Sequence, residues 1–101
     1  MAIRKSVDST FVLDNDREQI LIDCESALKK GNFKKIEVNK TIYQLTAKYK
    51  TFTVVGEIEI NLIPDGEKTS VQVKSTGNID NVFALFGSPG KKILNQFSSN
   101  L

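Results

Sequence analysis

Strict alternation of apolar and polar side chains constrains this chain more than any other feature of its sequence. The alternation runs through residues 41–50 and, over a longer reach, through residues 52–63. Because successive side chains of a β-strand point to opposite faces, the pattern predicts two strands, each with one apolar and one polar face. Such strands are typical of antiparallel sheets that are buried on one side and meet water on the other.

Three shorter stretches with the same period extend the predicted sheet to five strands. They cover residues 7–13, 33–38 and 69–76. Gly56 interrupts the apolar side of the longest strand, and a glycine inside a strand often marks a bulge or a sharp bend. We therefore expect the strongest curvature of the sheet at Gly56. Residues 64–66, Pro-Asp-Gly, predict a turn, since proline presets one backbone dihedral and glycine permits a positive one.

A first amphipathic helix is predicted over residues 16–30. Its apolar side chains recur at spacings of three and four and form one stripe: Ile20, Leu21, Cys24, Ala27 and Leu28. Asn15 and Glu18 have the spacing of a capping box, and Gly31 is expected to supply the left-handed conformation that ends many helices. Because Cys24 lies within the stripe and the sequence contains no histidine as a base partner, we expect a buried, unreactive thiol.

A second helix is predicted from Ser88 to the last residue, with Ser88 as the cap and Pro89 as the first helical residue. Its apolar stripe consists of Ile93, Leu94, Phe97 and Leu101. The preceding residues 79–86 are rich in large apolar side chains but have no dominant period. They predict a loop that either folds over the core as a lid or forms part of a binding surface.

These elements give the order β-α-β-β-β-β-α in a single domain covering residues 1–101, a length that leaves no room for a second core. Each helix has one apolar stripe to bury, and the sheet offers one apolar face. We therefore predict an α+β fold in which a curved, antiparallel, five-stranded sheet carries both helices on the same face.

The predicted order resembles that of helix-grip, or TBP-like, α+β domains of bacterial proteins. The resemblance rests on residues 54–64, residues 69–75, and the return through Gly87 into a last helix ending at residues 97–101. It implies a fold that binds apolar small molecules, lipids or other proteins between the sheet and the last helix. The expected ligand contacts in such a pocket are aromatic: Phe11, Tyr43, Tyr49, Phe52, Phe83, Phe86 and Phe97.

The composition excludes several chemistries. The absence of histidine removes the commonest general base and metal ligand, and a single cysteine cannot form an internal disulfide. We find no catalytic motif, and we expect a binding protein without enzymatic activity, cofactor or metal. The longest apolar run, residues 82–86, is far shorter than a membrane span or a signal-peptide core, which predicts a cytoplasmic protein.

Two other functions stay open. The 79–86 loop or an edge strand would serve protein interaction or self-association. Weak nucleic-acid binding is the less favoured alternative, because the net charge is only +2. It would use residues 87–92, whose GSPG resembles the GXXG loop of KH domains, and a basic patch made of Lys29, Lys30, Lys34, Lys35, Lys91 and Lys92. The simpler interpretation of these lysines is a favourable charge at a helix end followed by a protected edge strand.

Overall fold

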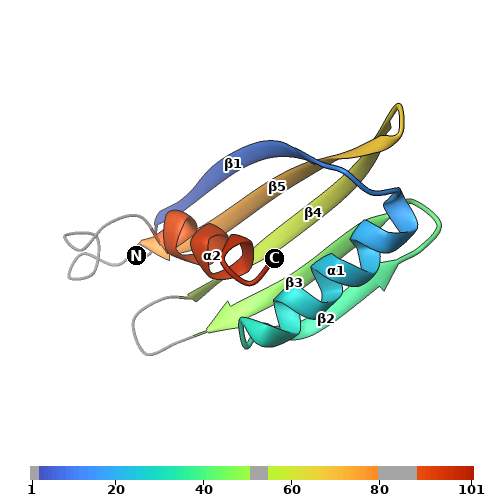
Figure 1. The fold of residues 1–101 in the computed structure, drawn as a ribbon. Coiled ribbons are helices and arrows are strands. Elements are labelled where there is room, and N and C mark those ends of the chain that lie inside the picture. Colours follow the sequence, from blue (N-terminus) through green and yellow to red (C-terminus); the bar gives the residue numbers. More distant parts are fainter. Residues whose placement is uncertain (1–2, 51–54, 80–88) are drawn as a thin grey trace.

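The computed structural model of the protein describes residues 3–50, 55–79 and 89–101, with side chains placed except at residues 3–6, 78–79 and 89–92 (Figure 1). The elements are β1 (Ile3–Leu13), α1 (Arg17–Lys30), β2 (Lys34–Asn39), β3 (Gln44–Lys50), β4 (Val55–Asp65), β5 (Lys68–Ile79) and α2 (Pro89–Ser98). This confirms the predicted order β-α-β-β-β-β-α.

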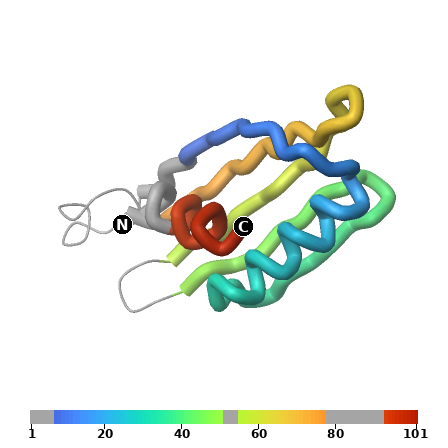
Figure 2. The backbone as a smooth tube through the Cα atoms, viewed as in Figure 1, coloured from blue at the N-terminus to red at the C-terminus, as the bar shows by residue number. Residues whose placement is uncertain are grey.

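The five strands form one antiparallel sheet in the spatial order β1-β5-β4-β3-β2. Strands β2 to β5 follow one another as a meander, and β1 pairs with the free side of β5. Helix α1 packs against β2, β3 and β4, whereas α2 packs against β5, β4 and β1 (Figures 1 and 2). The predicted α+β architecture, a curved antiparallel sheet with both helices on one face, is therefore confirmed.

The alternation read from the sequence places the core between the sheet and the helices. On the helix side, Ile60 lies between Leu45 of β3 and Val73 of β5, and all three are at most 2% exposed. Both helices contribute their stripes to the same cluster. Its described members are Ile20, Leu21, Cys24, Ala27, Leu28, Phe33, Leu45, Ala47, Ile58, Ile60, Leu62, Val71, Val73, Ile93 and Phe97.

Helix α1 and its N-cap each begin one residue later than predicted. The N-cap is Asp16, whose carboxylate accepts a hydrogen bond from the Gln19 backbone N–H at 2.9 Å. Aspartate and glutamine thus stand at the cap and third helical positions, in place of the predicted Asn15 and Glu18. A run of three capping-competent residues, 14–16, made the spacing ambiguous in the sequence.

The left-handed residue after α1 is Asn32, with φ 62°, and the prediction for Gly31, with φ −80°, is wrong. Asn32 N–H donates to the Lys29 carbonyl at 3.1 Å and Phe33 N–H donates to the Leu28 carbonyl at 3.0 Å. This pair of bonds is a Schellman motif, in which asparagine can replace glycine. Gly31 is needed for space instead, because a Cβ there would lie 2.9 Å from the Phe33 ring.

Gly56 does not form a bulge, which was one of the two features that a glycine inside a strand often marks. Its register runs without a shift, opposite Tyr49 on one side and Gly77 on the other. A Cβ at Gly56 would lie 2.6 Å from Ile93 Cδ1 and closer still to the Thr76 carbonyl oxygen. Gly56 therefore serves the close approach of α2 to the sheet. The register shift lies in β2, between Lys34 and Glu37.

The turn of the β4–β5 hairpin begins two residues later than the predicted 64–66 turn and shares Gly66 with it. Asp65 still pairs with Lys68, so the connecting residues are Gly66 and Glu67. Gly66 has φ 62° and a Cβ there would meet nothing within 4 Å. The hairpin extends from the end of the sheet that lies away from α2 (Figure 2).

Candidate functional site

A groove on the helix side of the sheet is the best candidate site among the described residues. It lies between one side of α1, the turn that leaves β1, and the two residues at the end of the chain, and its volume is about 280 Å³. The lining residues are Leu13, Asp14, Asn15, Ile20, Asp23, Ser26, Lys30, Asn100 and Leu101. The volume lies just below the range for ligand pockets, about 300–1,000 Å³.

Apolar and polar side chains both line the groove, and we call the apolar ones, Leu13, Ile20 and Leu101, its floor and the polar ones its rim. Leu13 is half-buried at the end of β1, and Ile20 is 1% exposed in the first part of α1. On the rim, Asp14 Oδ1 lies 3.2 Å from Lys68 Nζ, and Asp23 Oδ1 accepts a hydrogen bond from Gln19 Nε2 at 3.0 Å. A molecule with an apolar body and a polar end matches this arrangement.

Three hydrogen bonds hold the walls of the groove in place. Gln96 Nε2 in α2 donates to the Gly31 carbonyl at 3.3 Å, and Asn100 Nδ2 donates to the Gln96 carbonyl at 2.7 Å. The buried Thr69 Oγ1 donates to the Asn15 carbonyl at 2.7 Å. The end of α2 is therefore tied to the end of α1, and the turn after β1 is tied to β5.

The predicted aromatic contacts do not gather in one place among the described residues. Phe97 is fully buried in α2, and Phe11 is half-buried on β1, two residues before Leu13 on the same side. Tyr43 lies near the start of α1, with the Arg17 guanidinium 3.9 Å from its ring centroid. Tyr49 is at the other end of β3, its ring centroid 4.9 Å from that of Phe33. Phe52, Phe83 and Phe86 lie outside the described residues, so the aromatic pocket stays a prediction.

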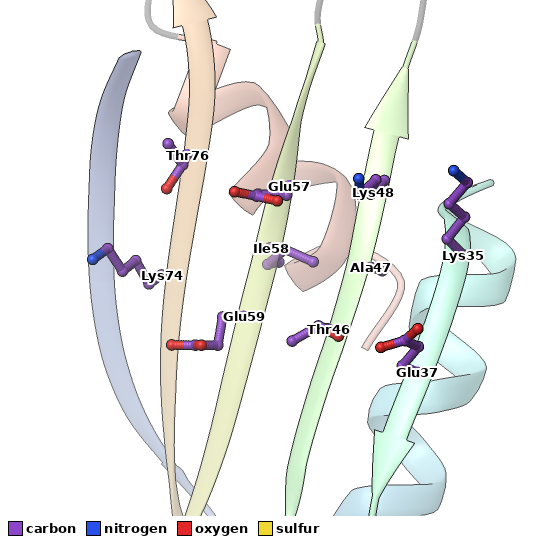
Figure 3. A pocket seen from close by; sticks show the side chains of 10 residues that line it. All are labelled: Lys35, Glu37, Thr46, Ala47, Lys48, Glu57, Ile58, Glu59, Lys74 and Thr76. Carbon is purple, nitrogen blue, oxygen red and sulfur yellow. The ribbon is translucent and has the colours of Figure 1, made fainter.

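The described lysines of the predicted basic patch are distributed over two surfaces. Lys30 lines the groove on the helix side, whereas Lys35 lies on the outer face of the sheet (Figure 3). Lys29 and Lys34 are exposed, and Lys29 Nζ lies 3.7 Å from Glu25 Oε2. The structure does not describe the side chains of Lys91 and Lys92.

The outer face of the sheet carries a shallow, charged hollow of about 500 Å³ (Figure 3). The strand register places Lys48 opposite Glu57, and Glu59 opposite Lys74. Opposite charges on neighbouring strands stabilise a sheet. The strand register therefore accounts for the mixed charge of the residues that line the hollow.

Cys24 has the environment of a structural residue. Its side chain is fully buried in the stripe of α1, and burial, with a smaller contribution from the Asp23 charge, raises its pKa to about 12. A thiol with this pKa carries almost no thiolate at neutral pH, so Cys24 is a poor nucleophile.

Apart from Lys30 of the predicted basic patch, no residue that lines the groove was predicted as a site residue. Asp23, Ser26 and Lys30 recur at spacings of three and four, which places them on one side of α1. This spacing could have been recognised in the sequence as one side of a helix. The other walls of the groove come from residues 13–15 and 100–101. Within the described ranges, we find no cluster of three potential metal ligands and no helix long and apolar enough to cross a membrane.

The chain matches solved structures but no sequence family. No protein-family model and no curated protein sequence matches it. Truncated norcoclaurine synthase from Thalictrum flavum superposes with a TM-score of 0.66 at 8% identity, over 98% of this chain and 91% of that chain. A START superfamily protein from Mycobacterium smegmatis gives a TM-score of 0.61 at 13% identity, over 94% and 92%. At such identities the likeness concerns the fold alone: the protein has a helix-grip fold.

Proposed function

We propose that this protein is a non-catalytic binding module for a small, largely apolar molecule held on the helix side of the sheet. The observation that carries the proposal is the groove between α1 and the end of α2, with Leu13 and Ile20 on its floor. The lack of histidine in the sequence and the raised pKa of Cys24 support a role without catalysis.

The fold offers support of a general kind. Norcoclaurine synthase from Thalictrum flavum, at 9% identity and a TM-score of 0.65, has been solved in complex with dopamine and hydroxybenzaldehyde. A helix-grip domain therefore can hold small molecules. For this chain, we propose the groove as the place where the apolar part of the ligand is buried, with Phe11 as the next contact along β1.

The rim sets the kind of ligand we expect. Carboxylates of Asp14 and Asp23 and the ammonium group of Lys30 surround the apolar floor. Because an apolar chain gains about 0.8 kcal/mol for each buried methylene, a short amphipathic molecule with its polar end at the rim fits best.

Binding of a neutral fluorescent probe, N-phenyl-1-naphthylamine, tests this proposal. Ser26 lines the groove and is exposed, so Ser26→Trp fills the groove without altering the core. We expect this substitution to raise the Kd of the probe by roughly tenfold or more. Native mass spectrometry of freshly purified protein would identify a ligand carried from the cell.

The matched control is Ile22→Trp, which adds the same side chain on α1 at a position that is 61% exposed and does not line the groove. Its Kd for the probe should stay within about twofold of that of the unaltered protein. A probe that does not bind, or that binds equally well to the Ser26→Trp variant, would contradict the proposed site.

A further inference from the structure

The two edges of the sheet differ in how they are protected against pairing with another strand. Strand β2 is short, carries Lys34 and Lys35, and has a register shift at which Lys35 adopts φ 50°. Lysines, shortness and bulges are the features by which edge strands avoid edge-to-edge association. The β2 edge is therefore protected.

The β1 edge is long and has no register shift, and its two basic residues, Arg4 and Lys5, lie at its beginning. All eleven residues of β1 pair with β5 in a regular register, and no other described strand lies beyond β1. Between Val7 and Leu13 there is one charged residue, Asp8, and no proline. This regular segment, with its single charge, presents a row of backbone N–H and C=O groups to an incoming strand.

The apolar side chains of β1 are also incompletely covered. On the helix side, Phe11 and Val7 are only half-buried, although their neighbours on β5, Val71 and Ser75, are completely buried. On the outer side, Val12 is 47% exposed. A strand paired with the free edge of β1 would cover the sides of these side chains that face away from β5.

We propose that β1 pairs antiparallel with β1 of a second copy of this chain, about a two-fold axis at Ser9. In this register Phe11 lies opposite the partner's Val7, so that two half-buried apolar side chains meet on the helix side. On the outer face, Asp8 lies opposite the partner's Thr10. Each contact occurs twice because the interface is symmetric.

Neighbouring registers are less favourable. An axis at Asp8 would place the two Asp8 carboxylates directly opposite each other, and like charges in that position are destabilising. An axis at Thr10 would place the apolar Val12 opposite the partner's Asp8. The Ser9 register joins two five-stranded sheets into one ten-stranded sheet, with all helices on one side.

Sedimentation velocity of the full chain over a micromolar dilution series tests the dimer and its register. Thr10→Asp places a carboxylate opposite the partner's Asp8 at two symmetric positions, and we expect the dimer Kd to rise roughly tenfold. Thr10→Lys places an ammonium group there instead, and its dimer should be as tight as, or tighter than, that of the unaltered chain.

The control is Gln72→Asp, which adds the same charge on the outer face of β5, directly opposite Thr10 and away from the edge. Its dimer Kd should not change. Amide hydrogen exchange of the unaltered chain gives a second readout, since protection of residues 7–13 should increase with protein concentration. The proposal would be overturned if the chain stayed monomeric throughout the dilution series, or if Thr10→Asp left the dimer Kd unchanged.

Discussion

At the scale of single residues, burial decides what Cys24 does. The core encloses the Cys24 side chain completely. This removal from water holds the pKa of the thiol near 12, well above its ordinary value of 9.0. Position within a helix was enough to predict burial here, because the apolar spacing of residues 20–28 is unbroken. The size of the pKa shift was not predictable, since it depends on how much protein surrounds the sulfur.

The raised pKa has a consequence for stability at high pH. The thiol ionises at pH 9.0 in the unfolded chain but near pH 12 in the folded one. Above pH 9 the unfolded state therefore loses this proton first, and Cys24 lowers the free energy of unfolding by about 1.4 kcal/mol per pH unit up to pH 12.

The difference between the unaltered chain and Cys24→Ala isolates this contribution from those of all other ionisable groups. Urea unfolding followed by circular dichroism from pH 8 to pH 11 measures it. Cys24→Ala should lose less stability with rising pH, whereas parallel pH dependences for both proteins would show that the thiol is not as shielded as the structure indicates.

At the scale of elements, periodicity identified every described helix and strand, and the ends of the elements were less predictable. The strand of residues 7–13 begins at Ile3, because pairing with β5 continues beyond the part with a clear pattern. The end of α1 depends on which of two neighbouring residues, Gly31 or Asn32, takes the left-handed conformation. Both types adopt it readily, and the Phe33 ring packed over Gly31 decides between them.

Asn32 tests this assignment through two substitutions at one position. Alanine at φ 62° is strained, so Asn32→Ala should destabilise the protein by about 1–2 kcal/mol. Asn32→Gly removes the strain and should leave stability unchanged within about 0.5 kcal/mol. Thermal and urea unfolding of both variants measure the difference, and equal stabilities would argue against a left-handed residue at this position.

At the scale of the whole molecule, the arrangement of layers followed from a count of apolar faces. One sheet with a single apolar face and two helices with one stripe each leave few ways to bury all three. The groove could not be predicted in the same way. Its walls come from residues 13–15, 20–30 and 100–101, and only their packing in space brings these segments together.

Attachment of α2 to the sheet depends on Gly56, so we expect Gly56→Ala to affect the molecule as a whole. The added methyl group would collide with Ile93 and the Thr76 carbonyl, forcing α2 outward. Overpacking of this kind costs about 1–3 kcal/mol. Urea unfolding should show that loss, and hydrogen exchange should show faster opening of residues 93–98.

A suitable control is Ile63→Ala, also in β4 but 40% exposed. Its effect should be under about 1 kcal/mol, and exchange in α2 should not change. If Gly56→Ala behaved like this control, α2 would not rest directly on the sheet at Gly56.

The open tip of the β4–β5 hairpin makes the protein easy to equip with a reporter. Nothing surrounds Gly66, and the neighbouring Glu67 is exposed, so a dye attached at Glu67 would extend into solvent. The chain has one cysteine, and its sulfur is enclosed in the folded state. A cysteine introduced by Glu67→Cys would therefore react selectively with a maleimide, which allows single-site labelling or surface tethering without removal of the native thiol.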